Sequence, residues 1–246
     1  MDHDRLELIL RWIGPGDTVL QVDGGPGMLA EQLAAKAGAF RTRGSDDRPR
    51  HVERTFRAGG AGVVMTETSM VAAERARAKG LFVVRADPDT DALPFADGRF
   101  DAVVSDSAIE HRFFPERSLD ESIRVLRPGG KYILLVPNLG HWRCRLWVLF
   151  GRFPSIQNGP TDPSHIRFFT LHEARRMLVA RGLEVIGRDG SACLWVKGLI
   201  PRILRLPPMN LLYARLARYF PSWLARDIIL VGRKPLSPID EPSAPQ

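Results

Sequence analysis

The chain has 246 residues, enough to bury one substantial core, and we expect one domain with appended segments. Its composition, 44% hydrophobic and 26% charged, is typical of a globular protein and excludes a low-complexity or fibrous chain. The formal net charge is +7, and residues 195–234 account for it, with eight Lys or Arg against one acid, Asp227. This concentrated positive charge favours binding to an anionic surface or an anionic substrate. No recognised nucleic-acid-binding motif accompanies it, so nucleic acid is a less favoured partner.

Cysteine usage and hydropathy indicate a cytoplasmic protein. Cys144 and Cys193 lie far apart, and no His or Cys cluster has metal-ligand spacing, so we expect two free thiols and no metal site. The charged N-terminus lacks the pattern of a signal peptide, and no apolar run is long enough to span a bilayer.

Strands and helices are predicted to alternate along the chain. Helices are expected at residues 4–13, 28–37, 69–79, 119–126 and 170–181, and strands at 18–22, 62–66, 81–85, 100–105, 132–136, 183–187 and 227–231. A tight turn is expected at "RPGG", residues 127–130. This alternation predicts a parallel, doubly wound sheet with helices on both faces, an α/β fold.

Two segments interrupt the alternation within a single domain at 1–234, and a tail follows this domain. Residues 38–61 are polar and rich in Arg and Gly, and we interpret them as an insertion. Residues 188–223 are basic and aromatic and are expected to form a lid before the last strand. Residues 235–246, "PLSPIDEPSAPQ", are expected to be a disordered tail.

A glycine-rich turn follows the first predicted strand. Residues 25–30, "GPGMLA", match G-x-G-x-x-G/A between a strand and a helix. Gly25 and Gly27 would let the backbone approach a ligand closely, and the helix N-terminus would offer unpaired N–H groups. A tight strand-to-helix turn also requires glycine without any ligand, so the motif alone leaves both interpretations open.

A carboxylate that binds a ribose is expected at the end of the second strand. Asp46 and Asp47 lie at the distance from the glycines that a dinucleotide site requires, but no apolar strand precedes them. Glu67 directly follows the apolar "GVVMT", so we favour it. The alternative for Glu67 is an acid that interacts with the dipole of the following helix.

The segment "LPFADGRFDAVVSDSAIEHRFFPERSLDESIRVLRPGGKYILLVPN", residues 93–138, closely resembles the central block of class I S-adenosylmethionine-dependent methyltransferases. Its Asp-Gly-x-Phe-Asp, Glu-His and Arg-Val-Leu-Arg-Pro-Gly-Gly motifs keep the order and spacing of that family. Within the family, the residues 11–20, 137–154 and 165–186 are most similar to MetW-like proteins of methionine biosynthesis. The resemblance implies a Rossmann-like, three-layer α/β/α fold with a seven-stranded sheet.

The same resemblance implies S-adenosylmethionine as the cofactor. Gly25 and Gly27 would pass close to its methionine portion, Glu67 would accept the ribose hydroxyls, and Asp87 the adenine amino group. The segment Ser105–Ser107, at the end of the fourth strand, would line the pocket. Asp87 could equally be a loop acid that caps the turn before Pro88.

The glycine loop departs from the family pattern at two positions. Where the family commonly has an acid and then, after one residue, the first glycine, this chain has Gln21 and Asp23. Gln21 can form hydrogen bonds but carries no negative charge for the cationic amino group of the cofactor. Asp23 either supplies that charge from a new position or crowds the turn and weakens binding.

Three histidines are candidates for a general base on the substrate side. His111, His141 and His165 each fall in a loop after a strand or just before a helix. For each of them the alternative is a histidine that caps or bridges loops. His165 is our preferred substrate-side residue.

The predicted function is methyl transfer from S-adenosylmethionine to a small-molecule or lipid-linked acceptor. The first alternative is a non-catalytic MetW-like partner protein that supports an acyltransferase in homoserine acylation, which the altered loop favours. A dehydrogenase that binds a dinucleotide comes third, because the block at 93–138 argues against it.

A helix over "NLLYARLARYF", residues 210–220, suggests a surface role for the basic segment. Leu212, Leu216 and Tyr219 would lie along one side, with Arg215 and Arg218 nearer the other. Such a helix either packs as a lid with its arginines in solvent or contacts an anionic membrane from the cytoplasmic side.

Overall fold

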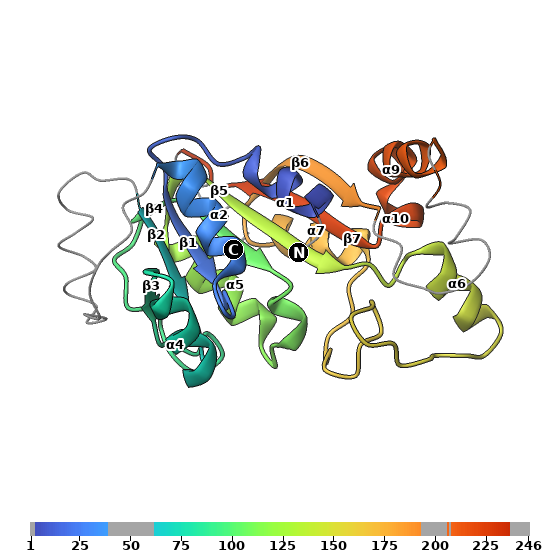
Figure 1. Cartoon of the computed structure of the whole chain (residues 1–246), viewed down its shortest axis with the longest axis horizontal. Coiled ribbons are helices and arrows are strands. Elements are labelled where there is room, and N and C mark those ends of the chain that lie inside the picture. Colours follow the sequence, from blue (N-terminus) through green and yellow to red (C-terminus); the bar gives the residue numbers. More distant parts are fainter. Residues whose placement is uncertain (1–2, 39–61, 193–205, 207, 237–246) are drawn as a thin grey trace, which may run out of the picture.

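The computed structural model describes residues 3–38, 62–192, 206 and 208–236 (Figure 1). In chain order the elements are α1 (His3–Leu10), β1 (Thr18–Val22), α2 (Met28–Ala37), β2 (Gly62–Thr66), α4 (Met70–Ala78), β3 (Phe82–Val84), β4 (Phe100–Asp106), the 3-10 turn η1 (Ile109–His111), α5 (Pro115–Val125), β5 (Leu126–Pro137), α6 (Trp142–Leu149), α7 (Leu171–Val179), β6 (Glu184–Ser191), α9 (Met209–Tyr219), α10 (Pro221–Leu224) and β7 (Asp227–Arg233). The bounds of β1, α2 and β2 coincide with the prediction.

The strands form one seven-stranded sheet in the order β3-β2-β1-β4-β5-β7-β6. The strands from β3 to β5 pair in parallel, whereas β7 is antiparallel to both β5 and β6. The doubly wound sheet is confirmed. Its strand β7 runs antiparallel because it pairs directly with β6, its predecessor in the chain, and needs no crossover connection. The order reverses direction between β1 and β4, the switch point at which sheets of this kind bind ligands.

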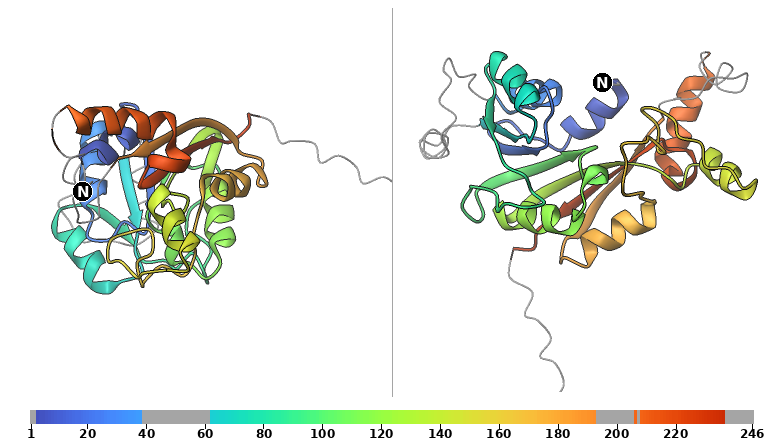
Figure 2. Two further views of the ribbon diagram at one scale, coloured as in Figure 1. Left: turned by 90° about the vertical axis from the view of Figure 1, so that its right-hand side faces the viewer. Right: turned by 90° about the horizontal axis from the view of Figure 1, so that it is seen from below.

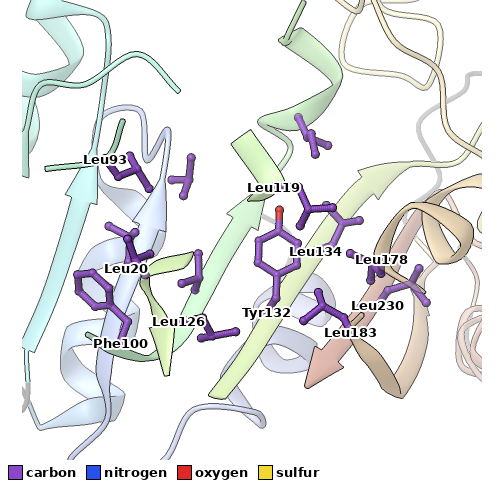
Figure 3. Close-up of a cluster of buried hydrophobic side chains, with 14 of the residues drawn as sticks. Leu20, Leu93, Phe100, Leu119, Leu126, Tyr132, Leu134, Leu178, Leu183 and Leu230 are labelled. Carbon is purple, nitrogen blue, oxygen red and sulfur yellow. The ribbon is translucent and has the colours of Figure 1, made fainter. Parts of the chain in front are cut away.

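Helices cover both faces of the sheet, so its strands are buried on each side (Figures 1 and 2). One core cluster joins alternate strand residues such as Val19 and Ile133 to α1, α2 and α4. The other cluster contains Leu20 and Tyr132 and packs against α5 and α7 (Figure 3). Successive residues of β1 therefore enter opposite cores, which explains why a buried parallel strand is apolar at nearly every position.

Two element boundaries differ from the prediction. Helix α5 begins at Pro115, four residues earlier than expected, because proline suits the first helical turn, where its missing N–H is no loss. The segment 127–130, expected as a turn, lies inside β5. The Gly129 N–H donates to the Lys234 carbonyl and the Lys234 N–H to the Gly130 carbonyl, so the chain after β7 holds this stretch in the sheet.

The predicted lid also begins later than expected. Residues 188–191 extend β6, which ends at Ser191, so they belong to the sheet. Helix α9 packs with Tyr213 and Ala217 buried, whereas Leu212, Leu216 and Tyr219 are exposed. The apolar side that was expected to pack thus faces solvent. The opposite side lies so close to β6 that a Cβ on Gly190 would be 2.9 Å from the Ala217 carbonyl oxygen.

Several sequence predictions lie outside the described residues. These are the proposed insertion from residue 39 onward, the tail beyond residue 236 and the state of Cys193. Cys144 is a buried free thiol, and burial raises its pKa to about 11. None of the helices in the described part of the chain has the length and apolar character that a membrane span requires.

Candidate cofactor and substrate site

The glycine loop connects β1 to α2 at the switch point of the sheet. Gly25 and Gly27 have φ angles of 56° and 78°, the left-handed region that favours glycine. A Cβ atom on Gly27 would lie 2.4 Å from Leu81 Cδ1 and 3.1 Å from the Cβ of Ala76, so the close packing of α2 requires this glycine. A Cβ on Gly25 would meet none of the described atoms within 4 Å. Gly25 therefore faces open space that a ligand could fill.

Asp23 and Gln21 place two acceptor atoms beneath this loop. Asp23 takes a φ angle of 52°, the backbone conformation of the glycine expected there, which Asp tolerates better than most residues. Asp23 Oδ1 and Gln21 Oε1 are both buried, and neither has a hydrogen-bond partner among the described residues. Burial raises the pKa of Asp23 to about 6, although the nearby Arg112 opposes this shift. Two unsatisfied acceptors at one turn fit a ligand that donates hydrogen bonds.

Arg112 joins acids of two loops, the one after β1 and the one after β3. Its guanidinium forms ion pairs with Asp23 and, at 2.7 Å, with Asp87, and it lies 3.9 Å from Asp89. Arg112 is 8% exposed, and it follows η1 directly. The sequence analysis did not identify this residue, because no motif pairs it with acids that lie 25 and 89 positions away in the chain.

Glu67, the predicted ribose acid, has two backbone partners. Its carboxylate accepts hydrogen bonds from the Gly25 N–H at 2.7 Å and from the Ser69 N–H at 2.8 Å. Ser69 caps α4, so Glu67 also serves the helix terminus, as the alternative interpretation proposed. Each carboxylate oxygen has a second lone pair, so these bonds leave acceptor capacity for a sugar hydroxyl. Glu67 thereby connects the glycine loop to the end of β2.

The serines at the end of β4 differ in their surroundings. Ser105 is 2% exposed and lies within the strand, whereas Ser107 has a φ angle of 51° and lines a cavity. Ser107 Oγ accepts a hydrogen bond of 2.6 Å from Arg5, which also pairs with Asp106. Helix α1 therefore reaches the switch point through Arg5, a contact that no sequence motif indicates.

Two of the three candidate histidines lie together. The rings of His111 and His165 meet edge to face, with their centroids 5.0 Å apart. His111 also contacts the carbonyl of Ser164, the residue before His165, although the two lie 53 positions apart in the chain. His141 lies elsewhere, where it caps α6 and bonds to the Tyr213 hydroxyl at 3.2 Å. Burial lowers the pKa of His141 to about 4. For His141 the loop-bridging interpretation therefore fits the geometry.

A cavity of about 210 Å³ lies beside these histidines. Its lining includes Arg5, Ser107, Glu110, His111, His165 and Asp227. Glu110 is 1% exposed, and neither of its carboxylate oxygens has a partner in the described part of the structure. Burial raises the pKa of Glu110 to about 8. The cavity adjoins the acid cluster of the glycine loop because Glu110, His111 and Arg112 are consecutive.

A larger cavity of about 420 Å³ lies between the start of α5 and α7. Residues such as Glu116, Arg167 and Arg176 line it, and its described lining includes none of the residues predicted for the site. We favour the smaller cavity as the substrate side, because it lies at the switch point and contains buried unsatisfied groups.

Known proteins resemble this chain in both sequence and fold. An uncharacterized methyltransferase of Mycobacterium sp. strain JLS is 34% identical over 119 residues, which are 48% of this chain and 38% of that protein. The ubiquinone/menaquinone biosynthesis C-methyltransferase UbiE of Roseobacter denitrificans is 31% identical over 137 residues, 52% of this chain and 46% of that protein. The chain thus spans less than half the length of these curated relatives.

Solved structures share the fold at low sequence identity. A protein of Haloferax volcanii, solved in complex with the Trm112 methyltransferase activator, superposes with a TM-score of 0.60 at 20% identity, covering 94% of this chain and 89% of that one. A S-adenosylmethionine-dependent methyltransferase of Thermotoga maritima gives 0.57 at 18% identity and covers 94% of both chains. The fold is therefore that of the class I methyltransferases.

One family model covers most of the central region, from the segment before β2 to β6. It is the model described as methionine biosynthesis protein MetW, and it matches residues 57–189, more than half of the chain. This range contains the Glu-His motif, Arg112 and both histidines of the cavity. The chain belongs to the MetW family of class I methyltransferase-fold proteins.

Proposed function

We propose that this protein is a S-adenosylmethionine-dependent methyltransferase that acts on a small-molecule or lipid-linked acceptor. The observation that carries the proposal is the pair of buried, unsatisfied acceptors, Gln21 Oε1 and Asp23 Oδ1, beneath a glycine loop at the switch point. The methyltransferase names of several relatives support the same activity.

The residues of the loop fit this cofactor. Asp23 would accept the amino group of its methionine portion, and Gly25 and Gly27 would allow close backbone approach. Glu67 would accept the ribose hydroxyls and Asp87 the adenine amino group, each at the end of its strand. Ser105 would support the pocket from β4, with its side chain nearly buried.

The cofactor, when bound, supplies a methyl group on a positively charged sulfur. The protein then needs to hold the acceptor in line and to exclude water from it. In this proposal the acceptor occupies the cavity beside Glu110, with His165 or His111 available to receive a proton if the acceptor must lose one. Burial lowers the pKa of His165, which keeps its imidazole neutral and able to accept a proton near pH 7.

A second candidate function is that of a non-catalytic partner that supports an acyltransferase in methionine biosynthesis. The contact that favours it is Arg112, which pairs with Asp23 and Asp87, two of the three acids assigned to the cofactor. A protein that had lost the cofactor could keep its fold through such a pair. The family name and the relative solved with an activator protein also support a role in an assembly.

Calorimetric titration separates these functions. The purified protein is titrated with S-adenosylmethionine, with its demethylated product S-adenosylhomocysteine and with NAD. We expect the first two ligands to bind and NAD not to bind, because Glu67 and the acids nearby match a nucleoside with a cationic tail. Binding of none of them would overturn the enzyme proposal and leave the partner function, whereas binding of NAD alone would indicate a dehydrogenase.

The variant Asp23→Gly tests the altered loop in the same titration. Glycine adopts the left-handed backbone conformation without strain, but the substitution removes the carboxylate that would hold the amino group. We expect a loss of affinity of about tenfold, the equivalent of one charge-assisted hydrogen bond of about 1.4 kcal/mol. A gain of affinity would instead show that Asp23 hinders the site.

We also propose that the protein contacts an anionic membrane surface through α6, α9 and α10. Arg145 of α6 stacks on Trp223 of α10 at 4.1 Å, so these helices form one surface at the end of the molecule (Figures 1 and 2). Its exposed apolar side chains are Leu146, Val148, Leu149, Phe150, Leu211, Leu212, Leu216, Tyr219, Phe220 and Trp223. Exposed arginines such as Arg215 flank them, which matches anionic head groups.

Vesicle sedimentation tests this surface. We expect the protein to bind vesicles that contain anionic phosphatidylserine and to bind neutral phosphatidylcholine vesicles at least about tenfold more weakly, because each arginine near the surface contributes about 1 kcal/mol. The variant Leu149→Ser, Phe150→Ser should lose binding. Equal binding of the variant and the parent protein would contradict the proposal, and Val179→Ser, an exposed apolar residue on α7, is the control.

A further inference from the structure

The cavity beside the cofactor loop contains a cluster of three side chains with donor atoms. One ligand atom each from Glu110, His111 and His165 lies within 4.8 Å of the other two. Glu110 and His111 come from η1, and His165 comes from the loop before α7. The methyl-transfer proposal assigns no role to Glu110, and it gives the two histidines only the optional role of proton acceptor, which a metal bound to their ring nitrogens would exclude.

The hydrogen bonds of the two histidines leave one nitrogen of each ring available. His111 Nδ1 lies 3.0 Å from the Ser164 carbonyl, and His165 Nδ1 lies 3.3 Å from the Pro160 carbonyl. A carbonyl can only accept, so both Nδ1 atoms must carry the proton. In a neutral ring with its proton on Nδ1, Nε2 carries the lone pair that a ligand atom needs. Metal-binding histidines are commonly oriented by this kind of backbone contact.

Glu110 contributes an oxygen that is otherwise costly to bury. Its carboxyl group is nearly inaccessible, and its two oxygens have no partner within the part of the chain described here. An unsatisfied buried carboxyl group is expensive, and a bound cation removes that cost. Neither arginine of the cavity forms a hydrogen bond with these oxygens, since Arg5 pairs with Asp106 and Arg226 lies 3.3 Å from Asp227.

We propose that Glu110, His111 and His165 form a site for a divalent transition-metal ion such as Zn²⁺. Two imidazole nitrogens and one carboxylate are a common set of protein ligands for zinc, and they argue against Mg²⁺ or Ca²⁺, which prefer oxygen. Tetrahedral zinc holds its ligands at about 2.1 Å and therefore about 3.4 Å from one another, so ligand atoms that lie within 4.8 Å need to approach by at most about 1.4 Å. The exposed His111 ring has room for this movement.

The fourth position of such a site would face the cavity. A site with three protein ligands keeps this position for water or for a lone pair of another ligand. Asp162 stabilises the loop that carries His165, since its carboxylate accepts bonds from Asn158 N and from the Ser164 N–H and hydroxyl. The loop is therefore held in place before a metal binds.

Metal titration of the full chain tests the site. The protein is first treated with a chelator and then titrated with Zn²⁺ by calorimetry, and with Co²⁺ by visible absorption, which reports the ligand geometry. We expect one ion per chain in the parent protein. Removing either ring, in His111→Ala or His165→Ala, should weaken the binding by about 100-fold or more, since even supporting residues contribute 10- to 100-fold.

The control variant is His172→Ala, which removes an exposed histidine of α7 and should bind the metal like the parent protein. The isosteric Glu110→Gln tests the oxygen ligand, and thermal melting of each metal-free variant verifies that it folds. Equal Zn²⁺ affinity in all variants, or no binding by the parent protein, would overturn the site. The titration contains no S-adenosylmethionine, so its failure is distinguishable from failure of the methyltransferase proposal.

Discussion

The variant Arg112→Gln is expected to lower the free energy of unfolding by about 3 kcal/mol at pH 7, at the low end for a broken buried ion pair. The loss arises because Asp23 would remain buried without its cation. The Asp87 side chain is 41% exposed, so water can solvate its carboxylate once the Arg112 guanidinium is removed. Urea unfolding measures the change, with the exposed Arg117→Gln of α5 as the matched control.

The pH dependence of stability gives a second measurement of the same contact. Burial raises the pKa of Asp23 from 3.8 to about 6, so the folded protein binds more protons than the unfolded chain between these values. This contribution to stability therefore falls as the pH rises from about 4 to about 6 and then stays level. Because Arg112 lowers the pKa of Asp23, the fall should extend to higher pH in Arg112→Gln. Identical pH profiles would contradict this coupling.

The same variant should bind S-adenosylmethionine about tenfold more tightly, equivalent to about 1.4 kcal/mol. Removal of the guanidinium frees two acids that attract a positively charged ligand. S-Adenosylhomocysteine lacks the charge on sulfur, so its affinity should rise less. Loss of binding in the variant would show that Arg112 supports the site and does not compete with the ligand.

Two glycine substitutions separate packing from ligand binding in the loop. Gly27→Ala is expected to destabilise the protein by about 3 kcal/mol, from overpacking and from the left-handed backbone together. The added Cβ would lie 2.4 Å from Leu81 Cδ1 at a φ angle of 78°. Chemical unfolding measures this loss.

Gly25→Ala is the matched control for stability and the test for binding. Its Cβ would meet no described atom within 4 Å, so only the backbone strain of about 1 kcal/mol should remain. If the cofactor lies against Gly25, the same methyl group should reduce its affinity at least about tenfold, the effect of about 1.4 kcal/mol of lost contact. Unchanged cofactor affinity in Gly25→Ala would contradict the proposed position of the ligand.

The secondary structure was largely predictable from the sequence wherever the hydrophobic pattern and the turn residues indicate the same element. Strand β1 and helix α2 were predicted with their observed bounds, because a short apolar run and a helical pattern meet at glycines with positive φ angles. Helix α5 was predicted too short, since its polar first turn "PERS" resembles a loop. The antiparallel direction of β7 has no local signal, because the apolar pattern of a buried strand is the same in either direction.

The candidate site was predictable only in part. Gly25, Glu67 and Asp87 could be proposed from the sequence because each follows a strand or belongs to a motif, and the end of a parallel strand has a known place in the fold. Arg112 and Glu110 were missed as functional residues. Their partners are distant in sequence, and burial without a hydrogen-bond partner becomes visible only when the chain is folded.

The sequence by itself determined the class I methyltransferase fold, the glycine loop with its changed residues Gln21 and Asp23, and the resemblance of residues 93–138 to that methyltransferase family. These properties depend on periodicity, turn residues and motif order, which are local along the chain. The tertiary structure alone decided that Arg112 pairs with Asp23 and that His111 meets His165 beside Glu110. The physical reason is that charge pairing, burial and ligand geometry depend on distances in space between segments that the sequence keeps apart.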